Sequence, residues 1–123
     1  MTLELLGETF SVCKVSDLDS ACRALAQSPF SFLARTDEEI SLVCPINAVP
    51  ACTCAREDGW RAFRVPGPHD FTLIGILEEL AHCLAQAVVS LFAVSTYNTD
   101  YVLVRETDLE RAISAFRQSG YLP

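Results

Sequence analysis

The sequence predicts an α+β fold of two similar halves, each an antiparallel sheet with helices on one face. Half of the 123 residues are apolar, so the chain can bury a core, although two halves of about 60 residues would each be marginal alone. Strands and helices are predicted in the order strand–helix–strand–strand–helix, and this order occurs twice. A short internal repeat accompanies that order. The prediction is therefore two ferredoxin-like (βαββαβ) domains in tandem.

Four elements are predicted in the first half. They are a strand at 9–15, a helix that starts at Ser16, and strands at 30–35 and 40–44. Ser16 is expected to be the N-cap of the helix, and Pro29 stops it. The acidic turn at 36–39 is expected to join the two later strands as an antiparallel hairpin. Residues 45–57 are expected to hold a short helix and then a loop.

The second half repeats this pattern with a longer first helix. Its elements are strands at 60–65, 88–95 and 101–105, and helices at 71–87 and from Thr107 onward. Leucines at every third or fourth position give the 71–87 helix an apolar face. Thr107 and Glu110 form a capping-box pattern at the start of the last helix. Gly120 stands where a helix C-terminal glycine is expected.

The halves are expected to be domains of residues 1–59 and 60–123, and each lacks an obvious final strand. The segment 60–65 could close the first sheet or open the second. The apolar segment 2–6 could cross over to complete the second sheet, and two sheets that each close locally would contradict this strand exchange. The internal repeat aligns 32–36 with 92–96 and 40–43 with 101–104.

The net charge of −7 argues against nucleic acid and anionic membranes as partners. Both reward clustered basic residues, and the nine Lys and Arg residues of this chain are scattered. The N-terminus has no basic region followed by an apolar stretch, so no secretory signal is predicted. The longest apolar segment, 84–94, is too short to span a bilayer. We therefore expect a cytoplasmic protein.

Six cysteines are many for this length, and without an export signal they are expected to be reduced. Four of them lie among apolar residues and are expected in the core: Cys13, Cys22, Cys44 and Cys83. Cys52 and Cys54 form the only close pair, but a zinc site needs further ligands that the sequence does not place nearby. No metal and no cofactor are predicted.

No catalytic motif is found, and the chain is expected not to be an enzyme. There is no Walker loop, dinucleotide fingerprint or metalloprotease signature. His82 and Cys83 are adjacent, so their side chains diverge on a helix and cannot act together. An enzyme that uses Cys52 or Cys54 stays as an alternative, and it predicts an unusually reactive thiol.

One motif resembles a known family. The run FAVSTYNTDYVLV at 92–104 joins two predicted strands, and DLERA follows at 108–112. The stretch 76–121 is similar to small bacterial ACT-domain proteins related to the CASTOR arginine sensors and to aspartokinase regulatory domains. The resemblance extends more loosely over most of the chain, and it implies a regulatory module that binds an amino acid where two ACT domains meet. A sheet with helices on only one face leaves its other face or its edges to be covered, so we also expect an interface within the chain and a homodimer.

The resemblance also implies two groups of ligand-binding residues. The loop after the first strand of the second half, with the helix start, would supply backbone donors: Val65, Gly67, His69, Asp70, Phe71, Thr72 and Gly75. The connection between the next two strands would supply polar side chains: Ser95, Thr96, Asn98, Thr99 and Asp100. Asp100 is the expected partner of an ammonium group or a cationic side chain of the effector.

The residues alone allow simpler explanations. A helix start near Asp70 suits a carboxylate ligand, but Asp70 can also serve only as a cap. The polar run 96–100, taken alone, is most simply a hairpin turn. Two functions therefore stay open: a sensor whose amino acid binds at the domain interface, and a ligand-independent oligomerisation or protein-interaction module.

Overall fold

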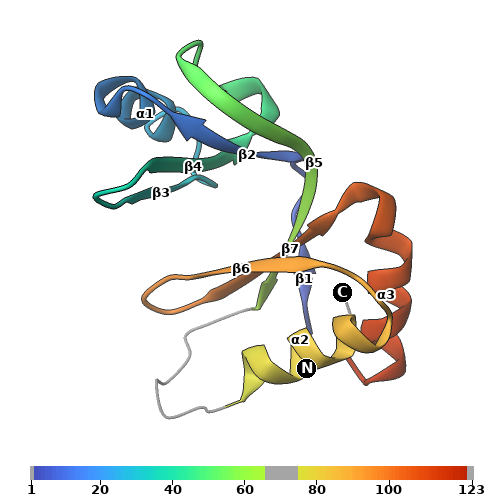
Figure 1. The fold of residues 1–123 in the computed structure, drawn as a ribbon. Helices are drawn as coiled ribbons and strands as arrows, with labels where there is room; N and C mark the ends of the chain where they lie inside the picture. Colours follow the sequence, from blue (N-terminus) through green and yellow to red (C-terminus); the bar gives the residue numbers. More distant parts are fainter. Residues whose placement is uncertain (1, 66–74, 122–123) are drawn as a thin grey trace. The chain divides into compact units, whose positions relative to one another are not determined.

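A computed structural model describes residues 2–65 and 75–121 of the chain (Figure 1). The contacts divide the chain into two compact units. The inserted unit is Glu8–Trp60, and the outer unit combines Met1–Gly7 with Arg61–Pro123. The outer unit is therefore discontinuous in sequence, with the inserted unit between its two segments along the chain.

The inserted unit contains a four-stranded antiparallel sheet. Its elements are β2 (Phe10–Val15), α1 (Leu18–Leu25), β3 (Phe32–Arg35), β4 (Ile40–Pro45), the 3₁₀ helix η1 (Ile46–Ala48) and the first part of β5 (Thr53–Val65). The strands lie in the order β3-β4-β2-β5. The helix α1 packs on β3 and β4, and Ala21 and Ala24 bury its inner face beside Leu42 and Cys44. The predicted strands and the predicted hairpin are confirmed.

The strand β5 belongs to both units. Its residues up to Trp60 pair with β2, and its last residues lie in the outer unit. A bulge at Gly59 marks the transition, because Phe10 faces Trp60 while Ser11 faces Asp58. Gly59 takes the extra position with φ +85°, a left-handed conformation that glycine adopts at no steric cost. The strand thus pairs within both units, and the ladders form one seven-stranded sheet.

The prediction of a loop in the second part of segment 45–57 is wrong. The structure has strand from Thr53 onward, because this segment hydrogen-bonds to β2 as the edge of the inserted sheet. Its residues Cys54 to Asp58 are exposed, and an exposed edge strand lacks the apolar alternation by which strands are recognised in sequence.

The outer unit contains the remaining strands of a seven-stranded sheet that shares β5, together with two helices. Its elements are β1 (Glu4–Leu5), the end of β5, α2 (Ile76–Gln86), β6 (Leu91–Ser95), β7 (Asp100–Arg105), the 3₁₀ helix η2 (Glu106–Asp108) and α3 (Leu109–Gln118). The order is β1-β5-β7-β6, and α2 packs against α3. Phe63 and Phe116 meet edge to face, with ring centroids 5.1 Å apart. The predicted α+β fold with antiparallel sheets is confirmed.

The N-terminal segment completes the outer sheet. Glu4 pairs with Arg64 and Leu5 with Phe63 in an antiparallel ladder, and the Arg64 guanidinium forms an ion pair with the Glu4 carboxylate. Leu3 is 1% exposed and lies in the core of this unit. Segment 2–6 thus pairs with strand residues of the second half of the chain, as the predicted crossing requires.

The helix ends agree only in part with the sequence. The N-cap of α1 is Asp17, whose carboxylate accepts hydrogen bonds from the Ser20 amide and hydroxyl, so the prediction of Ser16 is wrong by one residue. Ser16 instead donates to the Cys52 carbonyl. The predicted capping box at Thr107 is absent, because that residue lies in η2 and α3 has no side-chain cap bond.

The C-terminal glycine of α3 is confirmed. Gly120 has φ +88°, its amide donates to Arg117, and the Tyr121 amide donates to Phe116. This pair of bonds is the Schellman motif. The end of α2 uses the same two bonds around Val88, which has φ +59° although it is β-branched.

The hairpins of the two units repeat at an offset of 60 residues. The strand β4 spans residues 40–45 and β7 spans 100–105, and η1 and η2 follow at 46–48 and 106–108. The predicted alignment of 40–43 with 101–104 is therefore wrong by one residue. An alignment that is shifted by one residue would match inward-facing side chains of one strand with outward-facing ones of the other. The correct offset gives both hairpins a turn of four residues, 36–39 and 96–99.

The cysteines are all free. Cys13, Cys44 and Cys83 are buried as predicted, whereas Cys22 is exposed on the outer side of α1, beside the buried Ala21. Among the described residues, no helix has the length and apolar character needed to cross a membrane.

Candidate functional site

The end of β5 and the start of β7 lie side by side in the outer unit. Arg64 precedes the last residue of β5, and its side chain hydrogen-bonds to Glu4 and to Tyr101 of β7; these bonds raise the pKa of Arg64 above its usual value. The β6–β7 turn at 96–99 is therefore at the same end of the sheet as Val65. Val65, from the first predicted group of ligand-binding residues, therefore lies at the same end of the sheet as the turn between Ser95 and Asp100, which belong to the second group.

The β6–β7 turn is held by Thr96. Its amide donates to the Thr99 carbonyl at 2.8 Å, and its hydroxyl donates to the same oxygen at 2.9 Å. In the inserted unit Thr36 makes the equivalent amide bond to Glu39 at 2.9 Å. The hydroxyl of Thr96 thus already has a partner within the turn, which accounts for this residue without a ligand.

Asp100 and Ser95 face the helices of the outer unit. Asp100 is two and four residues before Val102 and Val104, which are both buried in the core beneath α2 and α3. Alternate residues of a strand share a face, and Ser95 is the ladder partner of Asp100. These two polar side chains therefore lie on the helix-covered face, at the end of the sheet near the β6–β7 turn.

The helix α2 begins without a side-chain cap. Its N-cap is Gly75, with φ +91°, and the first helical bond runs from the Glu79 amide to the Gly75 carbonyl at 2.8 Å. The predicted cap, Asp70, lies outside the described residues. The amides of the first turn have no partner inside the helix, as at every α-helix N-terminus, and they carry partial positive charge.

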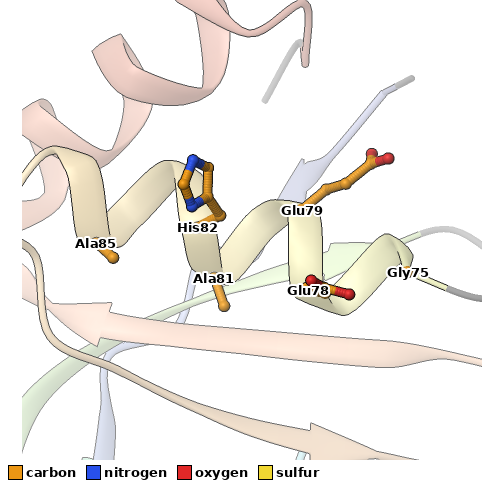
Figure 2. A pocket seen from close by; sticks show the side chains of 6 residues that line it. All are labelled: Gly75, Glu78, Glu79, Ala81, His82 and Ala85. Carbon is orange, nitrogen blue, oxygen red and sulfur yellow. The ribbon is translucent and has the colours of Figure 1, made fainter.

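A groove of about 730 Å³ runs along the outer face of α2 (Figure 2). The residues described as lining it are Gly75, Glu78, Glu79, Ala81, His82 and Ala85. Figure 2 shows Glu79 and His82 on one side of the helix and Ala81 and Ala85 on the other. Only Gly75 was predicted, because apolar periodicity identifies the buried face of a helix and carries no signal for a groove on its polar face.

Glu79 also ties α2 to the end of the chain. The Tyr121 hydroxyl donates to a Glu79 carboxylate oxygen at 2.5 Å, and this bond raises the pKa of Tyr121 to about 12. Tyr121 packs edge to face on Phe116. One side of the groove is therefore held by a bond to the segment that follows α3.

Some of the remaining predicted site residues lie in the described part of the chain and others lie outside it. Val65 is fully buried, so only its backbone can meet a ligand, while Asn98 is exposed in the turn. The others lie outside the described residues: Gly67, His69, Asp70, Phe71 and Thr72. Within the described parts of the chain, no three His, Cys, Asp or Glu side chains are close enough together to hold a metal ion.

The two units are α+β folds with antiparallel strands, and comparison with known proteins identifies the family of the chain. The model of the ACT domain family matches residues 55–118. The chain therefore belongs to the ACT domain family. No curated protein sequence matches it.

Solved structures show the same fold. Protein Atu0741 from Agrobacterium tumefaciens has a TM-score of 0.84 at 27% identity, over 98% of this chain and 90% of that protein. A Vibrio cholerae protein described as a possible transport protein has a TM-score of 0.70 at 19% identity, over 92% and 84% of the two chains. The ligand-free regulatory subunit of aspartate kinase from Thermus thermophilus has a TM-score of 0.63 at 10% identity, over 96% of each chain.

Proposed function

We propose that this chain is a non-catalytic regulatory protein that binds an amino acid through two ACT-type domains in tandem. The domains correspond to the predicted 1–59 and 60–123, with segment 2–6 exchanged into the second. The strand orders support this, because β3-β4-β2-β5 and β6-β7-β5-β1 are the same sequence of second, third, first and fourth strands. In the inserted domain, the short 3₁₀ helix η1 takes the position of the second helix of the βαββαβ fold.

The observation that carries the binding proposal is the polar end of the outer sheet. Asp100 and Ser95 share the helix-covered face there, and α2 starts on that face without a side-chain cap. An amino acid presents one carboxylate and one ammonium group. The free amides at the start of α2 suit the carboxylate, and the Asp100 carboxylate suits the ammonium group.

The other predicted contacts complete this proposal. Backbone groups of the 65–75 connection would bind the effector, and Asn98 and Thr99 would add polar contacts from the turn. The ligand would lie at a junction of two ACT domains, in a cytoplasmic homodimer. The aspartate kinase regulatory subunit has the same fold, which supports a regulatory role for this chain.

Thermal unfolding with each of the twenty amino acids tests the proposal. A ligand at a hundred times its Kd stabilises the native state by about 2.7 kcal/mol, so one amino acid should raise Tm clearly. Asp100→Ala should reduce that shift strongly, whereas Asp37→Ala, in the equivalent turn of the inserted unit, should leave it unchanged. If no amino acid raises Tm at millimolar concentration, the binding proposal fails, and a stable oligomer would then favour the ligand-independent interaction module.

A further inference from the structure

Cys52 and Cys54 are two thiols that the proposed function does not use. Three of the other cysteines are buried: Cys13, Cys44 and Cys83. Burial raises the pKa of the Cys44 thiol to about 12, so this group is protonated near neutral pH and is a poor nucleophile. Cys54 and Cys22 are exposed and Cys52 is half-buried. Solutes can therefore reach Cys22, Cys54 and part of Cys52.

Cys54 occupies a second bulge of β5. Lys14 faces Ala55 while the next residue, Val15, faces Thr53, so Cys54 has no partner in the ladder with β2. The extra residue of a bulge is free of the regular pleat, and its side chain can be directed along the strand. The Cys54 sulfur lies 4.0 Å from the Cys52 carbonyl oxygen. The side chain of Cys54 is thus folded back toward Cys52.

The backbone around Cys52 is fixed from two sides. The Cys52 carbonyl accepts a hydrogen bond from the Ser16 hydroxyl at 3.2 Å. Thr53 bonds twice to the Pro50 carbonyl, through its hydroxyl at 2.7 Å and its amide at 3.3 Å. The two cysteines are therefore presented from an ordered turn, and the Cα atoms of residues two apart are separated by at most about 7 Å, which is the upper limit for a disulfide.

We propose that Cys52 and Cys54 are an oxidisable thiol pair that hydrogen peroxide converts to an intramolecular disulfide. Cys54 is the residue that peroxide attacks, because its thiol is the more exposed of the two. Cys52 is the resolving residue, because it is two positions away and its carbonyl oxygen lies 4.0 Å from the Cys54 sulfur. The half-buried Cys52 side chain packs against the core of the inserted unit, so it must turn outward to form the bond. Cys22, which is equally free and exposed, lacks such a neighbour in sequence and is the natural comparison.

The proposed reaction has two steps. The Cys54 thiolate attacks one oxygen of hydrogen peroxide, which breaks the O–O bond and gives a sulfenic acid and hydroxide. The hydroxide takes up the proton that the thiol released and becomes water. The Cys52 thiolate then attacks the sulfenic sulfur, which forms the S–S bond and releases the hydroxyl group as a second water. The two thiols lose two electrons and two protons in total, and peroxide is reduced to two water molecules. A thiol reductant reverses the change.

Mass spectrometry of the full chain after peroxide treatment tests the proposal. We expect a loss of about 2 Da per chain at this site, which dithiothreitol reverses. Trypsin leaves Cys44, Cys52 and Cys54 in one peptide, between the cleavage sites at Arg35 and Arg56. Fragmentation of that peptide must therefore place the disulfide between residues 52 and 54. This mapping uses the wild-type chain and does not depend on whether a variant folds.

Matched variants separate the two roles. Cys52→Ala should abolish the loss of about 2 Da at this site and leave Cys54 as a sulfenic acid that gains about 16 Da and is trapped by dimedone. Cys54→Ala should also abolish it, while Cys22→Ala should keep the disulfide at wild-type yield. A disulfide that involves Cys44, one that persists in Cys54→Ala, oxidation at Cys22 alone, or dimers linked through Cys54 would each overturn the proposal. None of these outcomes depends on amino-acid binding.

Discussion

Val88 has a backbone conformation that is costly for its residue type. It follows α2 with φ +59°, and its side chain is 81% exposed. Its amide and that of Val89 donate to Ala85 and Leu84, so the Schellman geometry holds residue 88 in this conformation. A left-handed conformation costs an L-residue about 1–2 kcal/mol, and more for a β-branched one. The exposed side chain offers little packing in compensation.

We therefore expect Val88→Gly to stabilise the protein. The relief of strain exceeds the entropy that glycine adds to the unfolded chain, so the free energy of unfolding should rise by about 1 kcal/mol. Urea denaturation measures this change. Val89→Gly is the control and should lower stability, because Val89 is buried in the core of the outer unit. An unchanged or lower urea midpoint for Val88→Gly would show that the strain is not released.

The carboxylate of Asp17, the N-cap of α1, is expected to make the stability of the fold depend on pH. The hydrogen bond from the Ser20 hydroxyl, helped by the backbone amides and Arg23, lowers the pKa of the Asp17 carboxyl below its usual range. A lowered folded-state pKa means that the stabilisation is complete above the unfolded pKa and is lost as pH falls through the folded value.

Asp17→Asn should remove this pH dependence, because asparagine caps a helix but does not titrate. Relative to the variant, the wild-type chain should lose stability as the pH falls through the lowered folded-state pKa of Asp17, while the difference near neutral pH stays constant. Thermal unfolding over pH 2.5–7 gives the comparison, and Ser20→Ala should weaken the same dependence by removing the main donor. Parallel curves for wild type and Asp17→Asn would contradict the role of this cap.

At the scale of elements, the order of strands and helices could be predicted, but their exact partners could not. The repeated strand–helix–strand–strand–helix pattern rests on apolar periodicity, which reports burial within each element. The 60-residue offset was missed by one position, because Ile40 and Tyr101 are both β-forming and Asp100 was assigned to the turn by its polarity. Only the ladder partner Ser95 shows that Asp100 is already in β7.

The strand β1 is a short element whose contribution comes from side-chain burial. It has two residues in the ladder, yet Leu3 and Leu6 on either side are buried. Leu3→Ala should lower the free energy of unfolding by about 2–4 kcal/mol, because it removes methyl groups from a packed core and leaves a cavity. Chemical denaturation is the measurement. Thr2→Ala is the control, since Thr2 is exposed, and an equally small effect of both substitutions would contradict the packing of β1.

At the scale of the whole molecule, the sequence predicted the family and the exchanged strand but only part of the site. The ACT resemblance predicted from the sequence depends mainly on the β6–β7 motif. In the structure this motif is a hairpin, and the Thr96 hydroxyl already bonds within its turn. Asp100 faces the helices for a topological reason that its sequence position does not reveal. The groove on α2 was missed because its lining side chains look like an ordinary solvent-facing helix surface.

The discontinuous outer unit leads to a test of the tandem arrangement. In the βαββαβ plan the last strand follows the second helix, whereas here that strand comes from the other end of the chain. A chain of residues 61–123 followed by a flexible linker and residues 1–7 should therefore be more stable than 61–123 alone. Burial of two leucines sets the gain at about 3 kcal/mol. Urea denaturation compares the two chains, and serine at positions 3 and 6 of the appended segment should abolish the gain. Equal stability with and without residues 1–7 would contradict the assignment of β1 as the fourth strand of this domain.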